Sequence, residues 1–313
     1  VCTALGATAI DLFQGHERSR LAAQPQMIGG LLLTLLSVAA LLAGLGLAGF
    51  VAAYVAGAAI QLSLLHRTAA RELFPIRPRW SWPRMHGLAR EAKPFALLSV
   101  LSNVTDVPVV DVLILGALFG SGAVGPYTAA LALVTRLLMI PYGVGDALYP
   151  AVAGGHRSNR PEVETTLRRC VLNLALITLP AALALTFLAP TVLGLLYGSE
   201  YLGAVDALRL LGWLLPLMGV NYVMRECLAA VHRQDLVVRL TLASCLLLLA
   251  LYGTLIPLFG VMGAAVAGVL REGVMLALWS RPFRAEFRQP FPTAELPRLT
   301  LALALMCLPL ACA

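Results

Sequence analysis

The apolar stretch over residues 94–150 contains several polar residues, and four of them are Asn103, Asp106, Asp111 and Arg136. Three of them are charged, and an apolar helix rarely carries a charge deep in its interior unless that charge has a partner or faces a polar path. The chemistry that these residue types offer is the pairing of opposite charges or the lining of a route for a polar group. Which of the two applies depends on the helices that carry them.

The composition places those helices in a membrane. Apolar residues make up 59% of the 313 residues and charged residues only 12%, whereas about a quarter of a soluble domain is charged. The apolar runs are separated by short polar joints, and each is close to the roughly 20 residues that a helix needs to cross the hydrocarbon core. We therefore predict an all-α polytopic membrane protein.

The apolar runs predict the order of the helices. The chain starts at Val1 and stops at Ala313 inside apolar runs, so we interpret it as a fragment that lacks helices at both ends. The six cysteines show no metal-ligand spacing, which favours a packing role for them. We expect a helix tail over 1–10, helices over 26–45, 47–65, 95–119, 125–152, 171–197, 204–228, 236–257 and 260–280, and a truncated helix from 299.

Basic residues alternate from joint to joint. Of the 23 Lys and Arg, 20 lie in the joints that contain residues 11–20, 66–93, 153–170, 225–239 and 281–298. The joints between them, near Gly44, Ser121, Ser199 and Phe259, contain none. Basic joints mark the cytoplasmic side of a membrane protein. The net charge of +7 therefore reports topology and contact with anionic lipid headgroups, and not binding of nucleic acid.

The remaining three basic residues lie within predicted spans. Counted from the outer end of each helix, Arg136 lies about 18 Å deep, Arg271 about 16 Å deep, and Arg209 about one and a half turns below the surface. We expect Asp106 and Asp111 at a depth similar to that of Arg136, so either could pair with it. Such a pair would be a packing contact between helices, or these residues would line a polar substrate path. Several charges at one depth on different helices favour the path.

Two further pairs are defined by spacing alone. Asp206 and Arg209 are spaced i,i+3 near the outer surface, which predicts a local ion pair. Glu272 follows Arg271 directly, and adjacent residues point about 100° apart, so the sequence assigns Glu272 no partner.

Prolines within spans predict kinks; they are Pro108, Pro141, Pro180 and Pro216.

The residues of the central hairpin carry a family resemblance. The run VVDVLILGALFGSGAVGPYTAALALVTRLLMIPYGVGDALYPAVA resembles the start of the second lobe in bacterial oligosaccharide flippases, the polysaccharide-biosynthesis branch of the multidrug/oligosaccharidyl-lipid/polysaccharide exporter superfamily. Three further segments are similar to that family in the same order: LFQGHERSR, LYGSEYLGAVDALRLLGW and FGVMGAAVAGVLRE.

The resemblance implies a two-lobed helix bundle, with the first lobe partial and the second six-helix lobe complete. Residues 1–65 would form the end of the N-terminal lobe, with the tail of helix 4 and helices 5 and 6. Residues 66–93 would be a cytoplasmic linker between the lobes. Residues 94–280 would form the C-terminal lobe, with helices 7 to 12, and residues 281–313 a cytoplasmic joint and a truncated helix 13.

The resemblance also implies a function. It predicts a transporter, not an enzyme, that flips a polyprenyl-diphosphate-linked oligosaccharide across the bacterial inner membrane by alternating access, for synthesis of cell-surface polysaccharide. Arg136 and Arg271 would bind the diphosphate, because a guanidinium fork can bind phosphate oxygens bidentately. Asn103, Asp106 and Asp111 would contact sugar hydroxyls or carry coupling protons. No cofactor is implied; the implied partners are the lipid-linked oligosaccharide, membrane lipids, and a glycan polymerase or glycosyltransferases of the same pathway.

Other functions remain open. A flippase for lipid-linked peptidoglycan precursors or a cation-coupled multidrug exporter of the same superfamily would have a similar sequence, although arginines near the midplane disfavour a cavity for cationic drugs. A membrane glycosyltransferase or glycan polymerase would need a large loop with catalytic carboxylates. The predicted outer joints are only a few residues long, and the predicted inner joints contain no paired-carboxylate, Ser/His/Asp or metal-ligand arrangement.

Overall fold

The computed structural model describes residues 19–72, 87, 110–156 and 158–287. Every regular element in these ranges is a helix, which confirms the all-α prediction. The predicted helix from 299, together with Asn103 and Asp106, lies outside the described residues. The chain divides into two compact units, Val1–His86 and Gly87–Ala313. The assignment of particular residues to two lobes and a linker stays a prediction.

The first unit is a pair of antiparallel helices, α2 (Ser19–Leu42) and α3 (Gly46–Glu72). The turn between them uses Gly44 and Gly46, whose φ angles of 69° and 62° favour glycine. The helices approach closely, because a Cβ atom on Gly57 would lie 2.7 Å from the Cα atom of Leu33. Small residues at such contacts are the usual means by which membrane helices pack. Helix α2 starts before the predicted span of 26–45 and ends three residues short of it, whereas α3 extends beyond both ends of the predicted span of 47–65.

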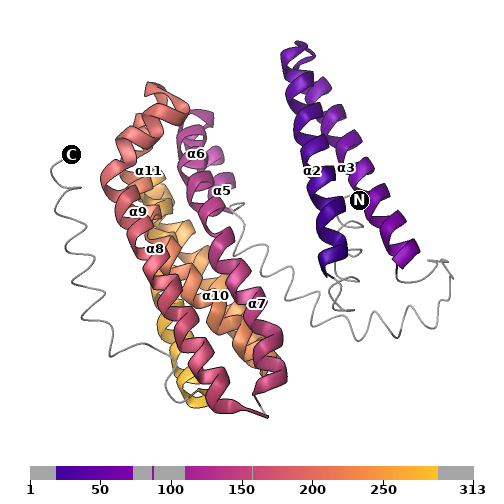
Figure 1. Ribbon diagram of the computed structural model, residues 1–313. Helices are drawn as coiled ribbons and strands as arrows, with labels where there is room; N and C mark the ends of the chain where they lie inside the picture. Colours follow the sequence, from indigo (N-terminus) through magenta and orange to yellow (C-terminus); the bar gives the residue numbers. More distant parts are fainter. Residues whose placement is uncertain (1–18, 73–86, 88–109, 157, 288–313) are drawn as a thin grey trace. The chain divides into compact units, whose positions relative to one another are not determined.

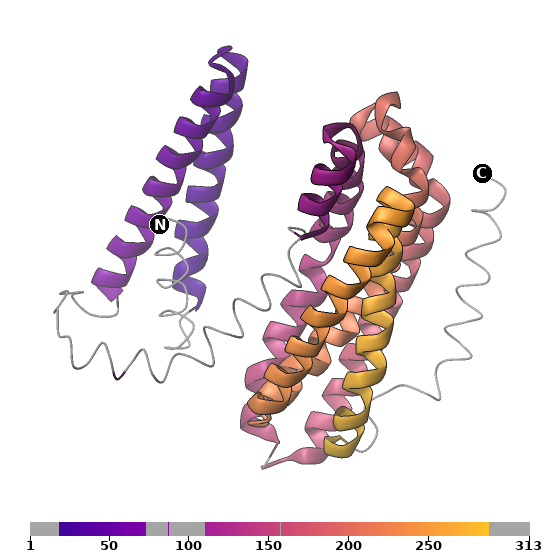
Figure 2. The same ribbon diagram turned by 180° about the vertical axis from the view of Figure 1, so that it is seen from behind.

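The second unit is a bundle of helices that run along a common direction (Figures 1 and 2). Helix α10 packs against α7, α8 and α11, so it lies at the centre of the contacts within the unit. The elements are α5 (Val110–Phe119), α6 (Ser121–Leu137), α7 (Met139–Gly155), α8 (Arg160–Tyr197), the 3-10 helix η1 (Ser199–Ala204), α9 (Val205–Leu211), α10 (Leu214–Ala230) and α11 (Gln234–Glu286).

Helix α11 turns back on itself at Gly260. The backbone angles there, φ 56° and ψ −129°, are not helical, and a Cβ atom on Gly263 would lie 2.0 Å from the carbonyl oxygen of Leu255. Such a contact eight residues away is impossible in a straight helix, which rises 1.5 Å per residue. Figure 2 shows the two legs of α11 side by side. The two spans predicted over 236–257 and 260–280 are therefore confirmed as the two legs of α11.

Two more breaks lie just before prolines. Helix α6 gives way to α7 at Leu138, three residues before Pro141. Helices α9 and α10 are separated at Gly212 and Trp213, and the pair that includes η1 is bent by 43° just before Pro216. A proline lacks the N–H that would bond to the carbonyl four residues earlier. The predicted kink is thus present before Pro216, and near Pro141 the structure shows a one-residue interruption between α6 and α7.

Helix α8 starts earlier than the sequence indicated. The prediction placed a loop over 154–169, but the helix begins at Arg160 and continues for 38 residues. Its length of about 57 Å exceeds the hydrocarbon core of about 30 Å, so it must extend past the apolar layer. Pro161 in the first turn, Glu162 near the positive helix end and the Arg160–Glu164 ion pair stabilise this polar extension.

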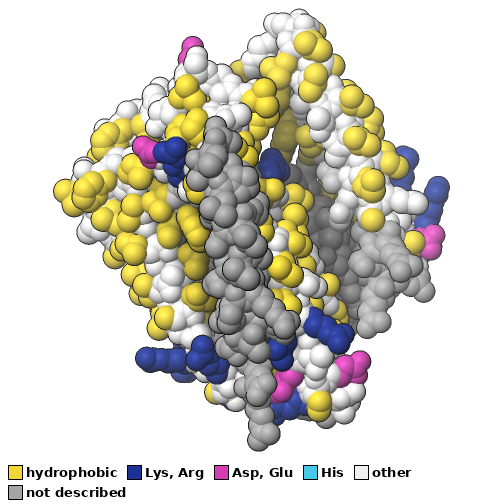
Figure 3. All heavy atoms as spheres, turned by 60° about the vertical axis from the view of Figure 1, so that its left-hand side comes forward, with side chains coloured by type: hydrophobic (Ala, Val, Ile, Leu, Met, Phe, Trp, Pro, Cys, Tyr) yellow, Lys and Arg dark blue, Asp and Glu magenta, His cyan; other side chains and the backbone are white. Residues whose placement is uncertain are grey.

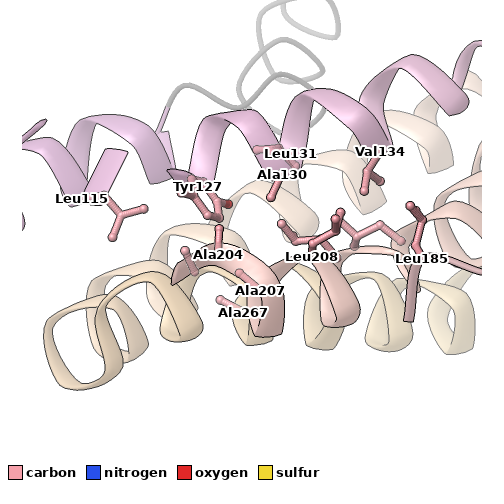
Figure 4. Packing of buried hydrophobic residues seen from close by; sticks show 14 of the residues in the cluster. Leu115, Tyr127, Ala130, Leu131, Val134, Leu185, Ala204, Ala207, Leu208 and Ala267 are labelled. Carbon is pink, nitrogen blue, oxygen red and sulfur yellow. The ribbon is translucent and has the colours of Figure 1, made fainter. Parts of the chain in front are cut away.

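The membrane character of the chain is plain in its surface. Large hydrophobic side chains are exposed, among them Leu42 at 84% and Leu195 at 83%. With the two legs of α11 counted together, five helical segments of the described residues are long and apolar enough to span a membrane, or six if the bent pair formed by η1, α9 and α10 is included. The protein is therefore a multi-pass membrane protein. Inside the second unit, Leu115, Tyr127 and Leu208 pack in a core of small and branched side chains (Figure 4).

Three of the predicted cytoplasmic joints meet at one end of the second unit. Nε2 of His156 lies 3.1 Å from Oε1 of Glu286, and Nη2 of Arg233 lies 3.4 Å from Oε2 of the same residue. These contacts join the end of α7, the start of α11 and the end of α11. In Figure 3 the dark blue Lys and Arg side chains gather toward the lower end, below a mostly yellow hydrophobic flank. The three helix ends that meet here all belong to joints that the positive-inside pattern predicts on the cytoplasmic side. Their contacts agree with that prediction.

Candidate functional site

Asp111 is buried at the start of α5, with 2% of its surface exposed. Its Oδ2 accepts a hydrogen bond of 2.5 Å from the hydroxyl of Tyr127, and its Oδ1 accepts one of 2.8 Å from the backbone N–H of Val112. A carboxylate at a helix N-terminus is favoured by the helix dipole. Both oxygens are therefore bonded inside the protein, and the residue joins α5 to α6.

Arg136 does not pair with Asp111. The arginine lies nine residues beyond Tyr127 on α6, which separates the two positions by about 14 Å along the helix, and its side chain is exposed. The expectation that Asp111 and Arg136 share one depth is wrong, because Asp111 lies only nine residues before the turn at Gly120 and Arg136 lies sixteen residues after it. Asp106, the other predicted partner, lies outside the described residues.

Arg271 and Glu272 form an ion pair with each other, although they are adjacent on α11. Both are buried, with 5% and 4% of their surfaces exposed. The Nδ2 group of Asn221 on α10 donates to Oε2 of Glu272 at 2.6 Å and to its backbone oxygen at 3.0 Å. Removing either charge would leave the other buried without compensation. This arrangement assigns Glu272 the partner that the sequence did not provide.

A small cavity lies beside this ion pair, and we call it the Arg271 cavity. It has space of about 40 Å³ for water-sized molecules, which is room for roughly three waters. Among the described residues, Oδ1 of Asn221 and Oγ1 of Thr241 are buried without a hydrogen-bond partner. Its lining is Tyr142, Met218, Asn221, Tyr222, Arg225, Thr241, Ser244, Arg271, Glu272, Met275 and Trp279. Such orphaned polar atoms are sites at which a water or another polar group can bind.

A second arginine, Arg225, lines the same cavity. The sequence interpretation counted it with the basic residues at the inner end of the helix predicted over 204–228, and the structure has it within α10, five residues before the end of the helix at Ala230. Its guanidinium lies 4.7 Å from the ring centre of Tyr222, in cation–π contact, and pairs with Glu226 at 3.3 Å. Two guanidiniums therefore face one polar cavity inside the bundle.

Tyr222 connects this cavity to α7. Its hydroxyl donates a hydrogen bond of 2.6 Å to Oδ1 of Asp146, and its ring centre lies 4.5 Å from that of Tyr142. Asp146 is exposed on α7. The sequence interpretation did not select Asp146, which lies ten residues beyond Arg136 and so about 15 Å nearer the inner end of the bundle.

The Asp111 and Arg271 sites are neighbours. Asp111 lies within electrostatic reach of Arg271, and Tyr252 of α11 lies close to both. The charged residues selected from α5 and from the second leg of α11 are thus brought together, while Arg136 stays apart. Among the described residues no group of His, Cys, Asp and Glu could hold a metal ion.

The predicted surface pair is confirmed. Nη1 of Arg209 lies 3.0 Å from Oδ1 of Asp206, and Nε of Arg209 donates to the backbone oxygen of Thr186 at 3.2 Å. Both side chains are well exposed, so the pair contributes little to stability. Arg209 is therefore a surface residue, in contrast to Arg271.

The fold and the buried charges define a polytopic helical membrane protein with a polar cavity inside its bundle, and solved structures with this fold are known. The chain matches the lipid II flippase MurJ in an inward closed conformation at a TM-score of 0.76 and 15% identity, over 97% of this chain and 64% of that one. It matches a multidrug resistance MATE family transporter of the MOP superfamily, inward-facing, at a TM-score of 0.73 and 15% identity, over 91% and 69% of the two chains.

Sequence comparison identifies the family. Residues 1–206 match the family model described as polysaccharide biosynthesis protein, so the chain belongs to that family. A curated relative, the probable low-salt glycan biosynthesis flippase Agl15 of Haloferax volcanii, is 27% identical over 193 residues, which are 61% of this chain and 41% of the relative. The chain thus spans less than half the length of this relative. The resemblance found in the sequence is confirmed at the level of the family.

Proposed function

We propose that the protein flips a polyprenyl-diphosphate-linked oligosaccharide across the bacterial inner membrane by alternating access, and that it is a transporter and not an enzyme. The observation that carries the proposal is the buried Arg271–Glu272 pair, bonded to Asn221 and facing a cavity that Arg225 also lines. Burying a charge pair at this depth costs desolvation free energy, and apolar side chains could pack the helices without that cost. Family membership and the flippase relative support the same function.

The substrate group that suits these residues is the diphosphate. Guanidiniums bind phosphate oxygens through paired N–H groups, and Arg271 and Arg225 would do so from two helices. The Arg271 cavity, at about 40 Å³, is too small to hold a diphosphate in this conformation. The proposal therefore requires the cavity to widen when the access changes. Asp111, Asp106 and Asn103 would contact sugar hydroxyls or carry coupling protons.

A flippase for lipid-linked peptidoglycan precursors is the second candidate. The match to the lipid II flippase supports it, and its cargo would present the same kind of diphosphate. Complementation of a strain that lacks its own peptidoglycan-precursor flippase separates the two candidates. Growth of that strain would favour the precursor, and failure to grow alongside rescue of glycan export would favour the oligosaccharide. The MATE match supports a drug exporter less well, because Arg271 and Arg225 would repel a cationic drug.

The sequence also predicted that Arg136 binds the diphosphate, and we keep this role as a separate proposal, because Arg136 does not line the Arg271 cavity. Its exposed side chain can be replaced without disturbing the core. Glycan export is measured in cells that depend on this protein, with Arg136→Ala, Arg136→Lys and the control Arg209→Ala, a surface arginine in a local ion pair. A bond to a charged group contributes about 1.5–3 kcal/mol, so we expect Arg136→Ala to slow export about tenfold or more. The lysine variant should recover part of the rate, and Arg209→Ala should export normally. Native export by both Arg136 variants at normal expression would contradict this role.

A further inference from the structure

A second cavity lies at the end of the second unit where the predicted cytoplasmic joints meet, and we call it the end pocket. Its volume of about 440 Å³ is roughly ten times that of the Arg271 cavity and falls within the range of about 300–1,000 Å³ typical of ligand sites. Its polar lining is His156, Arg160, His232, Arg233 and Glu286. The proposed transport function does not use this pocket.

The end pocket has an excess of hydrogen-bond donors and of positive charge. Arg160 donates to the backbone oxygen of Glu286 and to Oε1 of Glu164, and Arg233 donates to Oε2 of Glu286. These bonds account for two of the five N–H groups of Arg160 and for one of the five of Arg233. The lining thus contains two guanidiniums and two imidazoles but one carboxylate, that of Glu286, while Arg160 is also paired with Glu164 outside the lining. An anion is the ligand that this lining favours.

His232 is held in an unfavourable backbone conformation. Its φ of 63° is the only positive value of a non-glycine residue in the described ranges. The residue closes the C-terminus of α10, with its N–H bonded to the oxygen of Ala229 and that of Arg233 to the oxygen of Leu228. Glycine is usual at this position, and another residue there costs of order 1 kcal/mol. An imidazole that lines a pocket at that cost points to a role for the side chain.

His156 supplies an independent sign of a missing ligand. Its Nε2 faces Oε1 of Glu286 at 3.1 Å, so Nε2 carries the proton, and its ring packs edge-on against Phe287. The other nitrogen, Nδ1, is buried and has no hydrogen-bond partner among the described residues. A buried polar atom without a partner is uncommon. A donor in the end pocket would satisfy Nδ1 of the neutral ring, and an anion there would satisfy Nδ1–H of the doubly protonated ring.

We propose that the end pocket binds the phosphate of an anionic lipid headgroup from the cytoplasmic leaflet. The positive-inside pattern assigns this end to the cytoplasmic side, where anionic headgroups attract basic residues and fill basic pockets between helices. A phosphate bound by Arg160, Arg233 and His232 would connect the start of α8 with the junction of α10 and α11. The proposal does not depend on which substrate the protein transports.

Lipid binding is measured by native mass spectrometry on the purified protein in detergent, titrated with phosphatidylglycerol or phosphatidylcholine. The pocket variant Arg160→Gln/Arg233→Gln is compared with Arg239→Gln/Arg281→Gln, which removes the same charge from exposed positions of α11 outside the pocket. We expect native protein to prefer phosphatidylglycerol. The pocket variant should lose that affinity about tenfold, and the control less than about threefold. Equal losses in both variants, or no preference for phosphatidylglycerol in the native protein, would overturn the proposal.

Two further measurements distinguish a loss of lipid binding from misfolding and from binding of a different ligand. His232→Gly relieves the strained backbone, so it should melt no lower than native protein while binding phosphatidylglycerol several-fold more weakly. Unchanged lipid affinity in this variant would count against the site. Inorganic phosphate, added alone, tests whether the end pocket binds free phosphate instead of the phosphate of a lipid headgroup. If it raises the melting temperature through the pocket arginines while phosphatidylglycerol does not bind preferentially, the ligand is free phosphate and the lipid proposal is wrong.

Discussion

The hydroxyl of Tyr127 donates a hydrogen bond of 2.5 Å to Oδ2 of Asp111, and both side chains are buried in the core of the second unit. This bond connects the start of α5 to α6, sixteen residues further along the chain. It gives the carboxylate a fixed partner in a region where an unbonded charge would be costly. Asp111 is thereby held close to Arg271 and Tyr252.

Replacing Tyr127 with Phe should destabilise the protein. The ring still fills its place, but the buried carboxylate loses a bond, which costs about 1–3 kcal/mol. Thermal unfolding of the purified protein in detergent measures the change. Tyr149→Phe is the control, because that tyrosine is 38% exposed on α7. Equal melting of the two variants would mean that the Tyr127 hydroxyl contributes nothing to stability.

Arg271 and Glu272 should show strong coupling in a double-mutant cycle. Arg271→Met alone leaves Glu272 buried and uncompensated, at a cost of about 3–5 kcal/mol. Adding Glu272→Gln removes that charge and keeps an oxygen for the Nδ2 group of Asn221, so most of the loss should be recovered. Chemical unfolding of the native protein, both single variants and the double variant gives the coupling energy. Additive losses would rule out the buried ion pair.

Gly145 should not tolerate alanine. A Cβ atom there would lie 2.5 Å from the ring of Tyr222, so the ring must shift, and overpacking of this kind costs about 1–3 kcal/mol. Gly143→Ala is the matched control on the same helix, since its Cβ atom would meet no other atom within 4 Å. Melting temperatures that fall for Gly145→Ala and hold for Gly143→Ala are expected. A melting temperature that falls for Gly143→Ala and holds for Gly145→Ala would contradict the close contact of α7 with α10.

Gly260 should be required for the turn of α11. Its φ of 56° and ψ of −129° are in a region that side chains avoid, so Gly260→Ala should lose about 1–3 kcal/mol. Gly253→Ala, in the first leg of α11, meets open space and should be neutral or slightly stabilising because alanine favours a helix. Thermal unfolding compares the two. A native melting point for Gly260→Ala would mean that the backbone there differs from the structure.

The helices and their turns could be predicted because each depends on local sequence. Apolar runs set the spans, and Pro257 with Gly260 marks the turn between the legs of α11. The polar start of α8 was missed, because hydropathy identifies only the membrane-embedded part of a helix. Pro161 and the i,i+4 spacing of Arg160 and Glu164 were the available signals.

The site could be predicted only in part. Asp111 and Arg271 were found because a charge in an apolar run is conspicuous, but their neighbours depend on tertiary packing. Tyr127 and Asn221 are neutral, and nothing in their spacing identifies the carboxylates that they bond. Arg225 was not selected as a site residue, because it lies near the basic end of α10.

The central claim is that Arg271 and Glu272 serve the passage of a substrate as well as the packing of helices. The direct test is the rate at which Arg271→Met/Glu272→Gln, reconstituted in liposomes, flips a polyprenyl-diphosphate-linked oligosaccharide. This double variant should keep most of its stability, so a loss of rate can be separated from unfolding. We predict flipping slower by about tenfold or more, which corresponds to about 1.4 kcal/mol, at a near-native melting temperature. Flipping at the native rate would contradict the account and leave the pair a packing contact alone.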